Sequence, residues 1–191
     1  MKRILHCTTG LALLALAVSA FSGSIHAGGK GTVITFGKLS SKTPADWKSE
    51  KPDNKFRMAQ FTVPKVKGDE ADADLVIFYF GPGSGGSAKD NIERWKSMFR
   101  APAGKTLDDV ADVKEMEIPG AKLTYLDIHG TYVYKFPPFS PRAKEYRKPN
   151  YRMLNVFFAC EDGPYFIRIT GPEKTIAKHK EGFDNWLKSF K

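Results

Sequence analysis

The stretch DLVIFYFGPGSGGSAKDNIERW, residues 74–95, runs through a strand, a glycine loop and the first turns of a helix. Residues 75–80 are apolar at every position, which predicts a central strand covered on both faces. Ser87 followed by Asp90 resembles a capping box, in which both side chains bind amides at a helix start, and a helix is expected over residues 87–99. The glycines between them predict a sharp reversal of the chain, because glycine tolerates positive φ.

The glycine loop also matches a nucleotide-binding pattern, since Gly81, Gly83 and Gly86 fit G-x-G-x-x-G. Two observations count against a nucleotide site. Pro82 has no N–H to donate, and the following segments do not alternate strand and helix as a dinucleotide-binding fold requires. We therefore favour a structural turn. The alternative is a generic anion site for a carboxylate, sulfate or phosphate on the loop's amides. Its residues would be Gly83, Ser84, Gly85, Gly86 and Ser87.

The rest of the chain predicts further strands and one more helix. Apolar alternation marks strands at residues 33–36, 56–63, 113–118, 122–129, 131–134, 151–160 and 164–170. A closing helix starts at Pro172 or Glu173, with its apolar side chains at helical spacing. About six to seven strands and two main helices without regular β–α alternation indicate an α+β fold, a mostly antiparallel sheet with the helices packed on it.

The N-terminus predicts export. Lys2 and Arg3 precede an apolar run over residues 11–21, and small residues follow, which is the pattern of a secretory signal peptide over residues 1–27. Cleavage is expected after Ala27, with Ala20 as the second choice, and an uncleaved anchor is the alternative. Residues 28–191 then form a single α+β domain of 164 residues, located in the periplasm or outside the cell.

The charge balance indicates an anionic partner. The full chain has a net charge of +9; removing Lys2 and Arg3 leaves 28 basic against 21 acidic residues, or +7. An exported basic protein is expected to meet a protein or an anionic envelope polymer, not nucleic acid; the alternative is that the charge only maintains solubility. The remaining cysteine, Cys160, alternates with apolar residues along one strand, which favours a buried structural thiol over a nucleophile.

The segment FPPFSPRAKEYRKPN, residues 136–150, contains four prolines and is predicted to be a long surface loop. Aromatic and basic residues interleave in it, which suits contact with carboxylate or phosphate groups. The alternative is a loop folded over the sheet with solvated charges. The candidate binding residues of this segment are Arg142, Lys144, Tyr146, Arg147 and Lys148.

The sequence contains no complete metal-binding or catalytic motif. Asp127 and His129 share a strand face and could begin a metal site, but no third ligand is evident, so neither a metal nor a cofactor is expected. His179 lies among charged residues and is expected to be a solvated helix residue. No catalytic motif such as G-x-S-x-G or H-E-x-x-H occurs.

Two segments resemble a known fold. TPADW, residues 43–47, resembles the Pro-x-x-Trp start of the PsbP-like fold, and residues 163–190 resemble its last strand and closing helix. RMAQFTVP, YFGPGSGG, NIERW, YRML and GPYFIRITGP are similar to motifs of a family of exported bacterial proteins of unknown activity. The resemblance implies an antiparallel sheet with helices on its faces, and an accessory or binding role; it transfers no metal or cofactor residues.

The function expected from the sequence is therefore that of an exported, non-enzymatic accessory or binding protein that acts through protein or polyanion contacts. The alternative is a small-ligand-binding or enzymatic domain that uses a pocket near the glycine loop, residues 81–87.

Overall fold

The computed structural model describes residues 30–137 and 140–191. The predicted signal peptide, residues 1–27, and both cleavage positions lie outside the described residues. Within these residues, no helix combines the length and the apolar character needed to cross a membrane.

The described chain is an antiparallel α+β fold, as predicted. Its main sheet has eight strands in the order β3-β4-β5-β10-β9-β8-β6, with β7 also paired to β8, and β1 and β2 form a separate hairpin. The strands are β1 (Val33–Phe36), β2 (Leu39–Lys42), β3 (Lys48–Glu50), β4 (Arg57–Val63), β5 (Ala73–Tyr79), β6 (Phe99–Arg100), β7 (Ala111–Ile118), β8 (Ala121–Phe136), β9 (Lys144–Cys160) and β10 (Gly163–Pro172). The helices are α1 (Ala88–Lys96) and α2 (Glu173–Lys188), with a 3₁₀ turn at Asp108–Val110.

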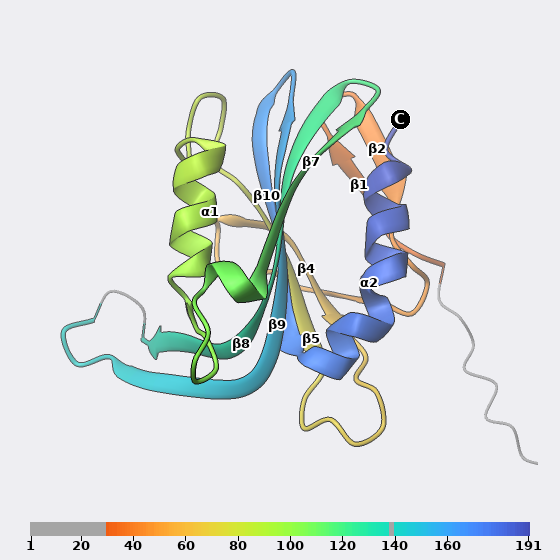
Figure 1. Ribbon diagram of the computed structural model, residues 1–191. Helices are drawn as coiled ribbons and strands as arrows, with labels where there is room; N and C mark the ends of the chain where they lie inside the picture. Colours follow the sequence, from red (N-terminus) through yellow and green to blue (C-terminus); the bar gives the residue numbers. More distant parts are fainter. Residues whose placement is uncertain (1–29, 138–139) are drawn as a thin grey trace, which may run out of the picture.

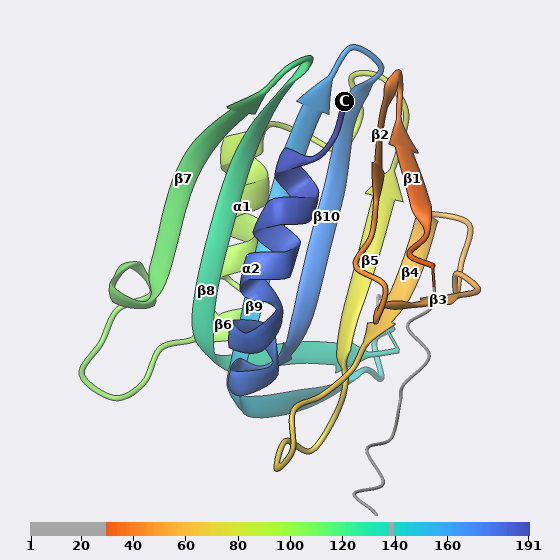
Figure 2. The ribbon, with the colours of Figure 1, turned by 90° about the vertical axis from the view of Figure 1, so that its right-hand side faces the viewer.

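The two faces of the sheet are covered unequally. Figure 1 shows α1 on one face, with α2 and the β1–β2 hairpin on the other. Figure 2 shows α2 lying across β8, β9 and β10, and the hairpin lying over β4 and β5, so that together they cover this face. On the opposite face α1 has only nine residues and contacts β8 and β9. The β5 and β10 side of that face has no helix above it.

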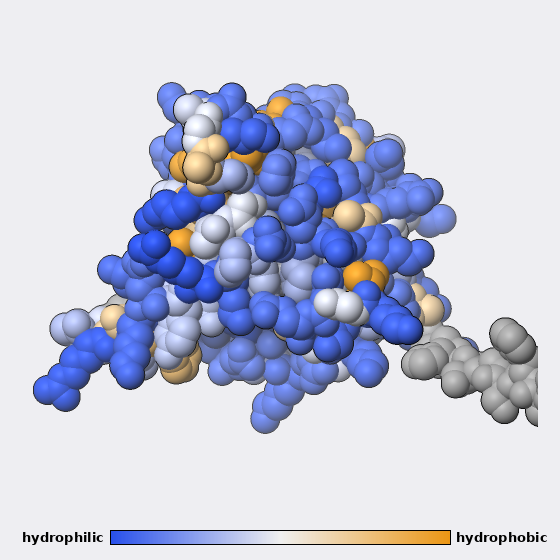
Figure 3. Space-filling view, turned by 60° about the horizontal axis from the view of Figure 1, so that its bottom comes forward, coloured by the Kyte–Doolittle hydropathy of each residue, from blue (hydrophilic) through white to orange (hydrophobic). Residues whose placement is uncertain are grey.

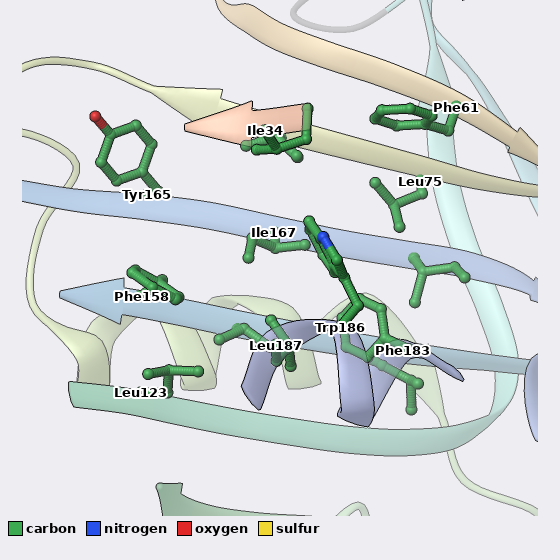
Figure 4. Close-up of a cluster of buried hydrophobic side chains, with 14 of the residues drawn as sticks. Ile34, Phe61, Leu75, Leu123, Phe158, Tyr165, Ile167, Phe183, Trp186 and Leu187 are labelled. Carbon is green, nitrogen blue, oxygen red and sulfur yellow. The ribbon is translucent and has the colours of Figure 1, made fainter. Parts of the chain in front are cut away.

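The larger hydrophobic core lies under α2 (Figure 4). Phe183, Trp186 and Leu187 of α2 are buried against apolar side chains of β5, β9 and β10, so the predicted helix stripe is confirmed. Burying each such side chain contributes about 1.5–3 kcal/mol. The α2 face is therefore the part of the molecule that contributes most to stability.

A second core lies under α1. Ile92 and Trp95 of α1 pack with Phe99 against Leu126 and Phe166 of the sheet. The helix is shorter than the predicted range of residues 87–99, because it ends at Lys96 and Phe99 belongs to β6. On β5, residues 75–77 are fully buried, as expected for a strand covered on both faces. The chain is no longer covered just beyond the end of β5, where Phe80 is 44% exposed.

The prediction of a long loop over residues 136–150 is wrong. β8 continues to Phe136 and β9 begins at Lys144, so most of this segment is paired strand. Pro137 and Pro141 fall in the turn between the strands, and Pro138 lies outside the described residues. Pro149 lies at an irregularity of the ladder, where it and Asn150 stand opposite a single residue of β8. A proline is tolerated there because a bulge does not require its N–H.

The sequence predicts two strands, residues 122–129 and 131–134, with a break at Gly130; this break is wrong as well, because β8 passes through it as one strand. The glycine has a different role. A Cβ at this position would lie 2.7 Å from the Arg100 carbonyl oxygen of β6, so only glycine permits this approach. Beyond it, the paired strands curve away from the sheet. We call this part, residues 131–137 and 140–150, the β8–β9 arm.

The main sheet has one or two strands more than the predicted six to seven. β3 and β6 have three and two residues, too few to show an alternating pattern. The polar segment Leu39–Lys42 forms β2 because it pairs with β1 and not because of its own composition.

Candidate functional site

A pocket of about 370 Å³ lies between α1 and the half of the sheet that this helix leaves uncovered. Its lining is mainly aromatic and apolar, with three polar side chains. The lining residues are Phe78, Phe80, Arg94, Trp95, Met98, Asn155, Phe166, Ile167 and Arg168. A mostly apolar cavity with a few convergent polar groups is the usual form of a small-molecule site.

The floor of the pocket contains a polar pair on neighbouring strands. Arg168 of β10 stands directly opposite Asn155 of β9 in the antiparallel register. Asn155 has no exposed surface, and neither its Nδ2 nor its Oδ1 has a hydrogen-bond partner in the described part of the chain. The Nε of Arg168 is also buried without a partner there. Buried polar side chains are almost always hydrogen-bonded, so two unpartnered groups side by side need an explanation.

Aromatic rings form the apolar part of the pocket. Phe78 and Phe80 stack at 6.0 Å between ring centroids, and Phe80 lies 5.5 Å from Phe166. The guanidinium of Arg168 lies 5.9 Å from the centre of the Phe78 ring. The partly exposed Phe80 marks the open end, and the buried Trp95 closes the side formed by α1.

The glycine loop borders this pocket. Gly85 has φ +90°, and a Cβ there would overlap the ring of Phe166, so the loop lies directly against a pocket residue. The Nδ2 of Asn91 donates to the carbonyls of Gly85 and Ser87, both at 2.8 Å, which ties the loop to α1. The sequence-based prediction of a structural turn is consistent with this packing.

The predicted cap of α1 is present in part. The Oγ of Ser87 accepts from the backbone N–H of Asp90 at 3.1 Å, as expected. The Asp90 carboxylate accepts from the Ser87 hydroxyl at 2.7 Å and not from a backbone amide. An anion on this loop would therefore lie close to the Asp90 carboxylate at the helix start. The amide of Ser84, one of the predicted anion donors, already donates to the Gly81 carbonyl at 3.3 Å. An anion site on residues 83–87 stays a prediction.

The basic residues predicted as a binding surface lie on the β8–β9 arm, away from the pocket. The register places Lys144, Tyr146 and Lys148 on one side of the arm and Arg147 on the other, while Arg142 lies in the turn before β9. Figure 1 shows the glycine loop and the arm at opposite ends of α1. The two groups of predicted site residues therefore form separate surfaces.

Asp127 belongs to a buried ion-pair network and not to a metal site. Arg152 binds both of its carboxylate oxygens, at 2.7 and 2.6 Å, and the Nζ of Lys180 lies 3.6 Å away. Lys180 also donates to the hydroxyl of Tyr125 at 3.0 Å, and burial raises the pKa of that hydroxyl far above its usual value. The described residues contain no group of three or more His, Cys, Asp or Glu side chains that could hold a metal ion.

His179 and Cys160 have structural roles. The prediction that His179 is solvated is wrong, because its side chain is only 11% exposed and its Nε2 lies 2.9 Å from the Pro64 carbonyl oxygen. Cys160 is half-buried and packs against the larger core. Burial raises the pKa of its thiol, which keeps the sulfur protonated and a poor nucleophile.

The pocket residues were not predicted from the sequence. Asn155 and Arg168 each interrupt a run of apolar residues, in MLNVFF and YFIRIT, and such an isolated polar residue in a predicted buried strand is the one signal available. No family model matches the chain, and no curated protein matches it. A crystal structure of PA94, a protein of unknown function from Pseudomonas aeruginosa, aligns with 84% of this chain and 96% of that chain, at 14% identity and a TM-score of 0.42.

Proposed function

We propose that this protein binds a small molecule with an apolar body and a carboxylate head in the pocket between α1 and the sheet. The observation that carries the proposal is the fully buried Asn155, whose two polar atoms have no partner in the described chain. A buried polar group without a hydrogen bond costs about 1–3 kcal/mol of stability. A ligand that bonds to this side chain recovers that cost.

The chemistry of the pocket matches such a ligand. The amide of Asn155 offers donors from Nδ2, and the guanidinium of Arg168 beside it offers charge-assisted donors to a carboxylate. Neither Arg94 nor Arg168 forms an ion pair with a described carboxylate, so the pocket has positive charge available. The phenylalanine rings contact the apolar body. Since no atom of Asn155 is exposed, a lining side chain has to move for the ligand head to reach the amide.

The lining favours binding over catalysis. Among its described residues there is no Ser, Thr, Cys, His, Asp, Glu, Lys or Tyr that could act as a nucleophile or general base. Together with the predicted signal peptide at residues 1–27, this supports an exported binding protein. The sequence left a pocket near the glycine loop as an alternative, and this pocket lies next to the loop through Phe166, although none of residues 81–87 lines it.

The test is isothermal titration of the purified protein with two probes of the same aromatic body, 2-naphthoate and 2-naphthol. We expect the carboxylate to bind more tightly, and the variant Arg168→Met to weaken it by roughly tenfold to a hundredfold, since a hydrogen bond to a charged group is worth about 1.5–3 kcal/mol. Arg100→Met, at an exposed arginine outside the pocket, is the matched control and should bind as the wild type does. The proposal is wrong if neither probe binds, or if the two arginine variants behave alike.

A further inference from the structure

The β8–β9 arm is a second exposed surface, independent of the pocket. It curves away from the sheet and projects below α1, at the lower left of Figure 1. Its base is held by β6, where Phe99 pairs with Tyr132, and by the Val133 amide, which donates to the Met98 carbonyl at 2.8 Å. Further along, the two strands of the arm pair with each other, from Tyr134 opposite Tyr146 to Phe136 opposite Lys144.

One side of the arm combines aromatic rings with lysines. Residues paired across an antiparallel ladder point to the same side, which places Phe136 beside Lys144 and Tyr134 beside Tyr146. Phe136 is 60% exposed and Tyr146 is 42% exposed. Large exposed rings at the far end of a projecting hairpin cost stability in water unless they have a partner.

The arm is strongly basic. Its described residues contain five cations and the single carboxylate of Glu145, a net charge of +4. The cations are Lys135, Arg142, Lys144, Arg147 and Lys148. Arg147 pairs with Glu145 at 2.9 Å, and Lys148 lies 3.5 Å from Glu70. The other three form no ion pair with the described residues. Figure 3 views the end from which the arm projects, and hydrophilic residues cover most of it.

We propose that the arm docks the protein on an anionic lipid surface. Exposed phenylalanine and tyrosine rings suit the interfacial region of a bilayer, while lysine and arginine bind its anionic head groups. Stacking on nucleic-acid bases fits less well, because the tyrosine rings already cover one another. Tyr134 stacks on Tyr146 at 5.3 Å and on Tyr132 at 5.5 Å.

The test is co-sedimentation of the purified protein with phosphatidylcholine vesicles that contain or lack phosphatidylglycerol. Each cation near an anionic surface raises binding roughly fivefold. The triple variant Lys135→Gln, Arg142→Gln, Lys144→Gln should therefore lose roughly a hundredfold in partitioning to the anionic vesicles. The variant Phe136→Ser should lose roughly tenfold without any change in charge.

A matched control removes the same charge elsewhere. Lys51→Gln, Lys174→Gln, Lys178→Gln changes three exposed lysines outside the arm and should bind as the wild type does. Circular dichroism confirms that each variant is folded. The proposal is overturned if the two triple variants lose binding equally, if neutral vesicles bind as well as anionic ones, or if no vesicles bind. It is also overturned if poly-L-glutamate abolishes the binding while Phe136→Ser has no effect, since that result identifies a soluble polyanion as the partner.

Discussion

Replacing Asn155 by leucine should make the protein more stable and impair its binding. The side chain has no exposed surface, and its two polar atoms have no partner in the described chain, so the fold bears their desolvation cost. Leucine has a similar volume and no polar atoms. With about 1 kcal/mol recovered for each atom, the free energy of unfolding should rise by about 2 kcal/mol. In a chain of this size, 1 kcal/mol corresponds to about 2–4 °C in Tm, so Tm should rise by about 4–8 °C.

The control for this prediction is Thr170→Val. The Oγ1 of Thr170 is likewise buried without a partner, but the residue does not line the pocket. This variant should gain about 1 kcal/mol and retain its affinity for 2-naphthoate, whereas Asn155→Leu should lose roughly tenfold in affinity. Differential scanning calorimetry and isothermal titration on the same samples measure both quantities.

A lower Tm for Asn155→Leu would refute the reasoning, because it would show that the wild-type amide is well bonded. Unchanged affinity in Asn155→Leu, alongside a higher Tm, would show that the amide is unpaired for a reason unrelated to the proposed ligand. The two measurements therefore separate the energetic argument from the functional one.

Three further outcomes are expected. Gly85→Ala should lower Tm by several degrees, because its Cβ would overlap Phe166, while Gly83→Ala, whose Cβ meets nothing within 4 Å, should cost less; thermal unfolding compares them. Burial, assisted by a nearby glutamate, raises the pKa of Tyr151 to about 12. The unfolded chain therefore releases this proton first, near pH 10, so its contribution to stability should be full below pH 10 and lost between about pH 10 and 12. Urea unfolding across that range should show a shallower decline for Tyr151→Phe; an equal decline contradicts the assignment. N-terminal sequencing of the protein isolated from the cells that make it should show cleavage after Ala27, and a retained N-terminus would argue for an anchor.

The elements that the sequence predicted correctly are those whose pattern is local. Ile92 and Trp95 in one segment, and Phe183 and Trp186 in another, fall at helical spacing. A helix forms in each segment, although α1 ends at Lys96 and not at the predicted residue 99. The sequence predicts a loop where the arm lies, because prolines disfavour a strand when its partner strand is unknown. The pairing of β8 with β9 overrides that local preference, since the described prolines of the segment fall in the turn and at one bulge.

The pocket depends on contacts between residues far apart in the chain, which explains why no local pattern revealed it. Phe80, Trp95 and Arg168 line one cavity only because β5 and β10 are neighbours and α1 crosses over β9. The register between β9 and β10 brings Arg168 next to Asn155. Each of these residues alone has an ordinary explanation as a strand or helix residue, and their proximity is a property of the fold.

The unequal coverage of the sheet explains why both proposed surfaces lie on the side of α1. Under α2 the core is mainly apolar, and the charged groups beside it, Asp127, Arg152 and Lys180, pair with one another. On the opposite face, the row that crosses β5, β10, β9 and β8 reads Val76, Arg168, Asn155 and Leu126, so two polar residues stand between apolar ones; on β4 the row continues to Gln60. A sequence selected for stability alone would place apolar residues at the two central positions. Local pattern, burial and the pairing of polar groups normally favour the same type of residue at a given position. A position where one of them disagrees is therefore a place where a functional constraint is expected. In this protein that place is the floor of the pocket.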